Sequence, residues 1–299
     1  MVKYNEIGLL AFAEKYKDDD SCREFLFKKR FPKGFICPKC ECGSYSLHST
    51  RCLYQCSNCK YQCSVTAGTV MHGTHIPLCK WFMAMYLLAK DKRGCSALQL
   101  SKELTLTYKS AWFLLQRLRS AMGQRDSEYI LSGIVEVDDS YFGGKKKGGK
   151  RGRGTKKSKV ITAVSKTEAG KPLFIKMQVV QDLKSATVKK FALHNIEENS
   201  QVQTDSYNSY KKLSAEKFTH KYEVFNPDTN WLHWLHILIG NVKSFIRGTF
   251  HGLKEKHLQL YLDEYCYRFN RRYYNGSIFD RLSVAAMFSS PLSYAELKG

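Results

Sequence analysis

Residues 133–144 read GIVEVDDSYFGG, a run that passes from β-branched apolar residues into carboxylates and glycines. Such a run is typical of a strand. A rigid strand that ends in aspartate can hold a carboxylate against Mg2+, which prefers oxygen ligands and keeps several waters. Alternation places Glu136 and Asp138 on one face of the strand and Asp139 on the other. Periodicity alone leaves both aspartates open as the metal ligand.

The chain after this strand continues a mixed pattern of strands and a helix. We expect strands at 160–164, 173–180 and 201–207, and a helix at 184–194. The last strand ends near Asp205, which lies 205 − 138 = 67 residues after Asp138. Two strands that end in aspartate could bring both carboxylates to adjacent strand ends. Aspartates at strand ends are also common turn formers, so the spacing alone leaves a structural role equally open.

The composition indicates a polyanionic partner. The 299 residues carry 48 Lys+Arg against 27 Asp+Glu, a formal charge of +21. Nucleic acid is the leading partner for such an excess, and an anionic membrane is the second. The most apolar run, residues 81–89, is far short of the ~20 residues that span a bilayer. The first twenty residues lack the order of a signal peptide. We therefore expect a cytoplasmic protein that does not contact a membrane.

Two CxxC pairs predict a structural zinc site. Cys37 and Cys40 form the first pair, and Cys56 and Cys59 form the second, with fifteen residues between the pairs. Each CxxC bends into a knuckle that aims two sulfurs at one point, and two knuckles complete a tetrahedron. Clustered cysteines of a cytosolic protein more often hold metal than form disulfides. The alternative is that some cysteines are only buried hydrophobes. The spare candidate ligands are Cys42, Cys52, Cys63 and His48.

Residues 77–125 predict helices that could read DNA. A short helix over 96–104, a turn at 105–107 and a longer helix over 108–119 match a helix-turn-helix. The second helix would enter the major groove with Lys109 near the bases. The alternative is a plain helical hairpin whose apolar residues face a core.

A glycine-rich basic segment follows the first carboxylate strand. Residues 143–159 carry nine Lys/Arg and no acid. Such a run is usually a solubilising surface, but beside a metal site in a strongly basic protein a contact with the DNA backbone is favoured. The candidate DNA-binding residues of this segment are Lys145, Lys146, Lys147, Lys150, Arg151 and Arg153.

Three motifs resemble those of a known family. They are VEVDDSYFGG at 135–144, TDSYNSY at 204–210 and GTFHGLKEKHLQLYLDEYCYRFNRR at 248–272. The chain resembles bacterial insertion-sequence transposases with an N-terminal zinc ribbon, the ISXO-type group of the DDE superfamily, which is related to the Merlin transposons. The resemblance implies an α/β fold, an RNase H-like mixed sheet with flanking helices, preceded by a small zinc ribbon and a helix-turn-helix. The implied division has four parts: an N-terminal helical segment at 1–30, a zinc ribbon at 31–70, a helix-turn-helix DNA-binding region at 77–125 and an RNase H-like catalytic domain at 130–290.

The resemblance also implies catalytic residues. The family's first aspartate falls on Asp138, with Asp139 in place of the following glutamate, and the second falls on Asp205. The third position, a glutamate in many members and an asparagine in others, falls on Asn241, which is 241 − 205 = 36 residues further on. No acid occupies 229–254. Three alternatives follow: Asn241 supplies a neutral oxygen ligand, a histidine (His236 or His251) helps, or this copy is inactive.

The activity implied by the resemblance is DNA cleavage and strand transfer through two Mg2+ or Mn2+ ions. Lys243, Arg247 and the basic loop at 145–159 would hold phosphates. The ribbon and the helix-turn-helix would recognise the terminal inverted repeats of the element. Joining two transposon ends to target DNA implies a homo-oligomer on double-stranded DNA. The alternatives are a domesticated or inactive DNA-binding protein, and a zinc-ribbon nuclease or RNA-processing factor that hydrolyses without joining.

Overall fold

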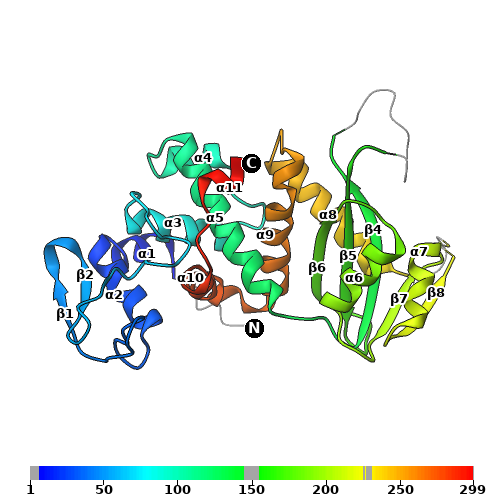
Figure 1. The fold of residues 1–299 in the computed structure, drawn as a ribbon. Helices are drawn as coiled ribbons and strands as arrows, with labels where there is room; N and C mark the ends of the chain where they lie inside the picture. The colour runs from blue at the N-terminus through cyan, green and yellow to red at the C-terminus, as the bar shows by residue number, and fades with distance from the viewer. Residues whose placement is uncertain (1–6, 145–154, 225, 227–230, 299) are drawn as a thin grey trace. The chain divides into compact units, whose positions relative to one another are not determined.

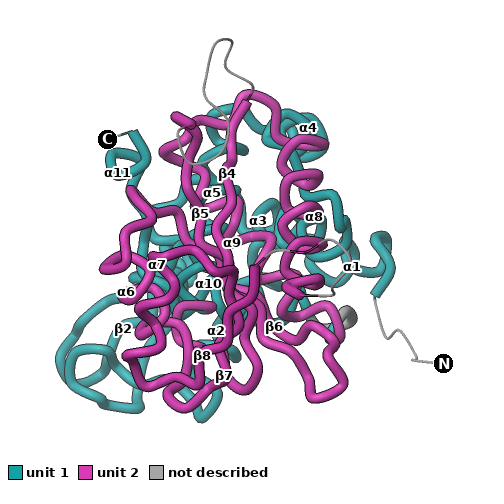
Figure 2. Tube along the Cα trace, turned by 90° about the vertical axis from the view of Figure 1, so that its right-hand side faces the viewer, with its two compact units in different colours: residues 1–125, 274–299 teal, residues 126–273 magenta. Residues whose placement is uncertain are grey.

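The computed structural model describes residues 7–144, 155–224, 226 and 231–298. The chain divides into two compact units (Figure 2). Unit 1 combines residues 1–125 with 274–299, and unit 2 is the continuous stretch 126–273. No helix among the described residues is long and apolar enough to cross a membrane.

Unit 2 is built on a five-stranded mixed sheet (Figure 1). The strand order is β6-β5-β4-β7-β8. β4 pairs antiparallel with β5 and β5 antiparallel with β6, whereas β4–β7 and β7–β8 are parallel. This order and these directions confirm the expected RNase H-like mixed sheet. The strands are β4 Ile134–Phe142, β5 Ser158–Lys166, β6 Pro172–Val180, β7 Gln201–Asp205 and β8 Thr219–Glu223.

Helices cover both faces of this sheet, so its strands bury apolar residues on both sides. The short helices α6 and α7 pack on one face, where Val135 and Val137 join Phe191 and Tyr210 in one core cluster. The longer α8 and α9 pack on the other face in a second cluster. The helices are α6 Ser185–Asn195, α7 Asn208–Lys211, α8 His233–Thr249 and α9 Leu258–Asn270.

Unit 1 holds the cysteine ribbon and a set of helices. The ribbon is a three-stranded antiparallel sheet in the order β1-β2-β3. The two helices expected at 96–104 and 108–119 are α4 and α5. The Ser96 hydroxyl caps α4 by accepting a hydrogen bond from the backbone N–H of Gln99. The elements are α1 Leu9–Lys15, α2 Asp19–Arg30, β1 Tyr45–His48, β2 Leu53–Cys56, β3 Gln62–Cys63, α3 Leu78–Lys90, α4 Ala97–Glu103, α5 Tyr108–Ser127, α10 Ile278–Phe288 and α11 Tyr294–Lys298.

The C-terminal helix α10 belongs to unit 1, although the sequence expectation placed residues up to 290 in the catalytic domain. α10 packs against α3 and α2. Its Phe279 ring lies 4.8 Å from the ring of Phe12 and 5.6 Å from that of Phe82. Aromatic pairs at such separations stabilise a core beyond the apolar area that they bury. Unit 2 therefore ends at Tyr273, and the chain returns to complete the aromatic core of unit 1.

Candidate metal centres

The four cysteines of the two CxxC pairs converge on one point. Their sulfurs lie within 4.8 Å of one another, with Cys37 and Cys59 3.6 Å apart and Cys40 and Cys56 3.5 Å apart. Tetrahedral zinc with bonds of about 2.3 Å requires sulfurs about 3.8 Å apart, so the cluster fits Zn2+. In the described parts of the chain the cluster consists of these four residues alone. The spare candidates, His48 among them, lie outside it.

The two knuckles share one backbone geometry. The residues after each pair, Glu41 and Lys60, have φ of 59° and 61°, the left-handed region. Each donates its backbone N–H to the carbonyl of the first cysteine of its pair, Cys37 or Cys56. The backbone N–H of Cys59 and further bonds to its sulfur lower the pKa of Cys56 to about 6. Burial and bonds to the neighbouring cysteine sulfurs raise the pKa of Cys59 to about 12, so the two thiols of this knuckle do not ionise together. The thiolate is the form that binds zinc.

Asp138 and Asp205 lie at the ends of neighbouring parallel strands. The register pairs Glu136 with Gln203 and Val137 with Thr204, so the next residues along are the two aspartates. Adjacent strands are about 4.8 Å apart, and residues at equal register share a face. The structure thus brings the two carboxylates together. Asp205 also accepts the backbone N–H of Tyr207 at 3.1 Å, so this residue shapes the turn as well.

Packing separates Asp138 from Asp139, which periodicity could not do. Asp138 faces α8, where its Oδ2 lies 3.4 Å from Nε2 of His236. Asp139 faces the opposite side and accepts a hydrogen bond from the Tyr210 hydroxyl at 3.5 Å. The bond to Asp138, and the charges of Asp138, Glu136 and Asp205, raise the pKa of His236 above its usual range. His236 therefore lies beside Asp138, within range of the charges of Glu136 and Asp205.

The side chain of Asn241 lies near Tyr265 of α9. On α8 it comes five residues after His236, which is about 140° further round the helix. Gly240 and Lys243 instead lie on the same flank as His236. His251 follows the end of α8 and lines the basic cavity described below.

A buried glutamate links the elements that carry the carboxylates. Glu136, 1% exposed, accepts Nζ of Lys166 at 2.7 Å and the backbone N–H of Leu235 at 2.9 Å. The same Nζ of Lys166 donates to Gln203 at 2.9 Å. Leu235 is the residue before His236, and Gln203 lies two residues before Asp205. The alternation along the strand had placed Glu136 beside Asp138 but had given it no role.

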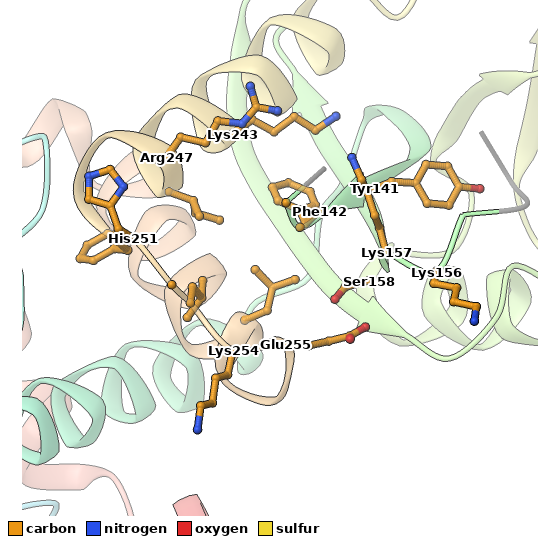
Figure 3. Close-up of a pocket in the computed structure, with 17 residues that line it drawn as sticks. Tyr141, Phe142, Lys156, Lys157, Ser158, Lys243, Arg247, His251, Lys254 and Glu255 are labelled. Carbon is orange, nitrogen blue, oxygen red and sulfur yellow. The ribbon is translucent and has the colours of Figure 1, made fainter. Parts of the chain in front are cut away.

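The proposed phosphate ligands Lys243 and Arg247 lie on α8, beyond the carboxylates, and line a cavity (Figure 3). Lys109 lies near the start of α5, with its ammonium 4.7 Å above the ring of Tyr294. The other expected DNA-binding residues fall outside the described residues: Lys145, Lys146, Lys147, Lys150, Arg151 and Arg153.

Comparisons with known proteins agree with this architecture. Residues 130–270 match an ISXO2-like transposase domain, and residues 17–62 match a transposase zinc-ribbon domain. A protein in the transposable element ISH50 of Halobacterium salinarum is 27% identical over 214 residues, covering 67% of this chain and 71% of that protein. A transposase-like protein of Haemophilus influenzae is 27% identical over 111 residues, 36% of this chain and 85% of that one.

Two solved structures were also matched at low similarity. The Mos1 strand transfer complex is 12% identical, with a TM-score of 0.29 over 70% of this chain and 78% of that one. The Mos1 paired end complex with Mn is 11% identical, with a TM-score of 0.28 over 69% and 78%. These TM-scores are too low to assign a fold, and the fold assignment rests on the strand order.

The family matches, together with the mixed sheet and the four-cysteine ribbon, support a transposase of the polynucleotidyl-transferase type with a zinc-binding module. The chain belongs to the insertion-sequence transposases that have an ISXO2-like catalytic domain and an N-terminal zinc ribbon.

Proposed function

We propose that this transposase binds the terminal inverted repeats of its element and cuts and joins DNA through divalent ions held by Asp138 and Asp205. The observation that carries the proposal is the equal register of these aspartates at adjacent strand ends, on the face covered by α8. Mg2+ or Mn2+ bound there would activate the attacking oxygen and stabilise the leaving one.

The residues of the chain have distinct parts in this proposal. Asp138 and Asp205 supply oxygen ligands from rigid strands, and the Glu136 network holds these strands against α8. Asn241 is the third ligand that the family implies, and this role requires its amide to turn away from Tyr265. His236, already 3.4 Å from Asp138, is the alternative group at this position.

Unit 1 is proposed to recognise the DNA. Tyr108 at the start of α5 is 58% exposed, and Lys109 is its neighbour, as expected for the first turn of a recognition helix. The ribbon would add phosphate contacts. Because two transposon ends must be joined to one target, we propose that the protein acts as a homo-oligomer on double-stranded DNA.

The test is an in vitro cleavage and strand-transfer assay on a duplex that carries the element's own ends, with Mg2+ or Mn2+. Asp138→Asn should abolish nicked and joined products, because it removes a carboxylate ligand. Asp139→Asn is the matched control. The Asp139 carboxylate faces Tyr210 on the other side of the strand, so this variant should retain activity. Loss of activity in Asp139→Asn with activity retained in Asp138→Asn would refute the assignment.

A second candidate function, an inactive or domesticated DNA-binding protein, is favoured by one observation. Residues 231–254, which the structure describes, contain no acid, so α8 offers no third carboxylate to Asp138. Tight binding of the ends, with no product from the wild-type protein, would select this function.

A further inference from the structure

A cavity of about 560 Å3 lies in unit 2, at the end of β4, the strand that also carries Asp138 (Figure 3). It is lined by the end of β4, the start of β5, the C-terminal half of α8 and the loop that follows α8. Its volume falls within the ~300–1,000 Å3 of sites that enclose a small molecule or one nucleotide.

The rim of this cavity is cationic. Lys157 from the β5 side and Lys243 and Arg247 from α8 line it, together with Lys156, His251 and Lys254, and Glu255 is the one acid of the lining. Burial and the charges of Arg247 and Lys157 lower the pKa of Lys243. These cations are therefore close enough to repel one another, and a phosphate among them would relieve that repulsion.

The floor of the cavity is apolar. Phe142, at the end of β4, lies beneath the Lys243 ammonium, which is 5.6 Å from the ring. Ile246, Phe250 and Leu253 complete the floor. A duplex backbone needs only cations, whereas apolar and aromatic walls suit the face of a base. Bases in a duplex are stacked inside it, so only an unpaired base can enter such a cavity.

The cavity is within reach of a DNA strand held at the carboxylates. Phe142 follows Asp138 by four residues on the same strand and the same face, which is about 13 Å. At 3.4 Å per nucleotide of one strand this corresponds to about four nucleotides. Unpaired DNA next to the reacting phosphate can therefore reach the cavity.

We propose that this cavity binds one unpaired nucleotide of the DNA strand, a few positions from the phosphate held at Asp138 and Asp205. Lys157, Lys243 and Arg247 hold its phosphate, and the base lies on the floor formed by Phe142, Ile246 and Leu253. The inference rests on the proposed function, because the strand is placed by the carboxylates.

The test compares a blunt duplex with the same duplex carrying a six-nucleotide single-stranded tail that contains 2-aminopurine. Dissociation constants and 2-aminopurine fluorescence are measured for the full-length protein with Ca2+, because the carboxylates can hold a phosphate only through a divalent ion. Leu253→Trp fills the cavity without changing a charge. Leu193→Trp is the matched control, because Leu193 is an exposed leucine of α6, 46% accessible, on the other face of the sheet.

We expect the wild type to bind the tailed duplex about tenfold more tightly than the blunt one, with a change in 2-aminopurine fluorescence at one tail position. Leu253→Trp should lose this preference and keep its affinity for blunt DNA, whereas Leu193→Trp should behave like the wild type. Equal affinities of the wild type for both probes, or a preference that survives Leu253→Trp in folded protein, would overturn the proposal.

Failure of this inference is distinguishable from failure of the proposed function. Cleavage by the wild type without any preference for the tail overturns the cavity assignment alone. A preference for the tail without cleavage overturns the proposed chemistry alone. The fluorescence of the wild-type complex tests the inference even if Leu253→Trp does not fold.

Discussion

On the flank of α8 that carries His236 and Lys243, the residue between them is Gly240, which has no side chain to offer the carboxylates. Gly240 is one helical turn after His236, on the same flank, and a Cβ added there meets no atom within 4 Å. Lys243 on this flank is also influenced by the charge of Asp138. Glycine costs a helix interior about 1 kcal/mol relative to alanine, so this residue leaves space at some expense of stability.

Gly240→Glu should therefore place a third carboxylate near Asp138 and Asp205. We expect the Mn2+ concentration for half-maximal binding to fall about tenfold, because each added charged oxygen ligand strengthens a hard-cation site. Isothermal titration of the full-length protein with Mn2+ measures this. Gly240→Gln has nearly the same shape without the charge and should change the affinity far less. Equal effects of the two substitutions would show that position 240 does not face the metal site.

Alternation along a strand was sufficient to name Asp138 and Asp139 as candidates but not to choose between them. The choice depends on which helices cover which face of β4, and that is a property of tertiary packing. The same holds for Asn241: the resemblance gives its position along the chain but does not say which flank of α8 faces the sheet. Asn241 lies near Tyr265 and about 140° round the helix from His236, and sequence alone carries no signal for this placement.

At the scale of elements, the buried Glu136 joins β4 to β5, to β7 through Lys166, and to the first turn of α8. Breaking a buried ion pair on one side leaves an uncompensated charge, which is costly. This pair is therefore expected to hold together the three elements from which the proposed metal site is assembled.

Glu136→Gln should destabilise the local structure by about 3 kcal/mol, because Lys166 loses its charged partner in a site with little solvent. Hydrogen exchange of the peptide that contains Leu235, followed by mass spectrometry, measures the free energy of opening of this region. Glu198→Gln removes the same charge from an exposed pair with Lys217, whose side chains are 58% and 68% accessible, and should cost less than about 1 kcal/mol. Equal exchange in the two variants would contradict the proposed role.

At the scale of the whole molecule, the zinc site and the sheet belong to different units. Ribbons of this size bury little apolar surface, and the metal supplies their folding free energy. Removal of zinc by a chelator should unfold the ribbon over 37–63 and leave the sheet of unit 2 intact. Hydrogen exchange of ribbon peptides compared with peptides of β5 checks this, and fast exchange in β5 would contradict it.

Cysteine variants test the ligand set independently. Cys56→Ser should lower the zinc content below one ion per chain, because it removes one of four converging sulfurs. Cys52→Ser should keep one zinc, since Cys52 lies outside the cluster and its thiol contacts the Ser49 carbonyl. Zinc measured by atomic emission separates the two variants. Loss of zinc in Cys52→Ser would widen the ligand set.

The extent of the units was the least predictable feature. The resemblance implied one catalytic domain over 130–290, as contiguous residues usually share a domain. The rings of Phe12, Phe82 and Phe279 meet across more than 260 residues of sequence, a pairing that no local pattern reveals. The ribbon, in contrast, is recognisable because its four ligands follow a fixed local spacing.

This return of α10 to unit 1 has a consequence for how the chain is synthesised. A ribosome delivers α1 to α5 first, yet their aromatic core stays open until Phe279 has emerged. Unit 2, which is continuous, can fold while the nascent chain is still attached. A message broken after the codon for residue 273 would therefore yield a catalytic unit whose N-terminal companion has an unfilled core. Quality control by proteolysis would act on that companion first.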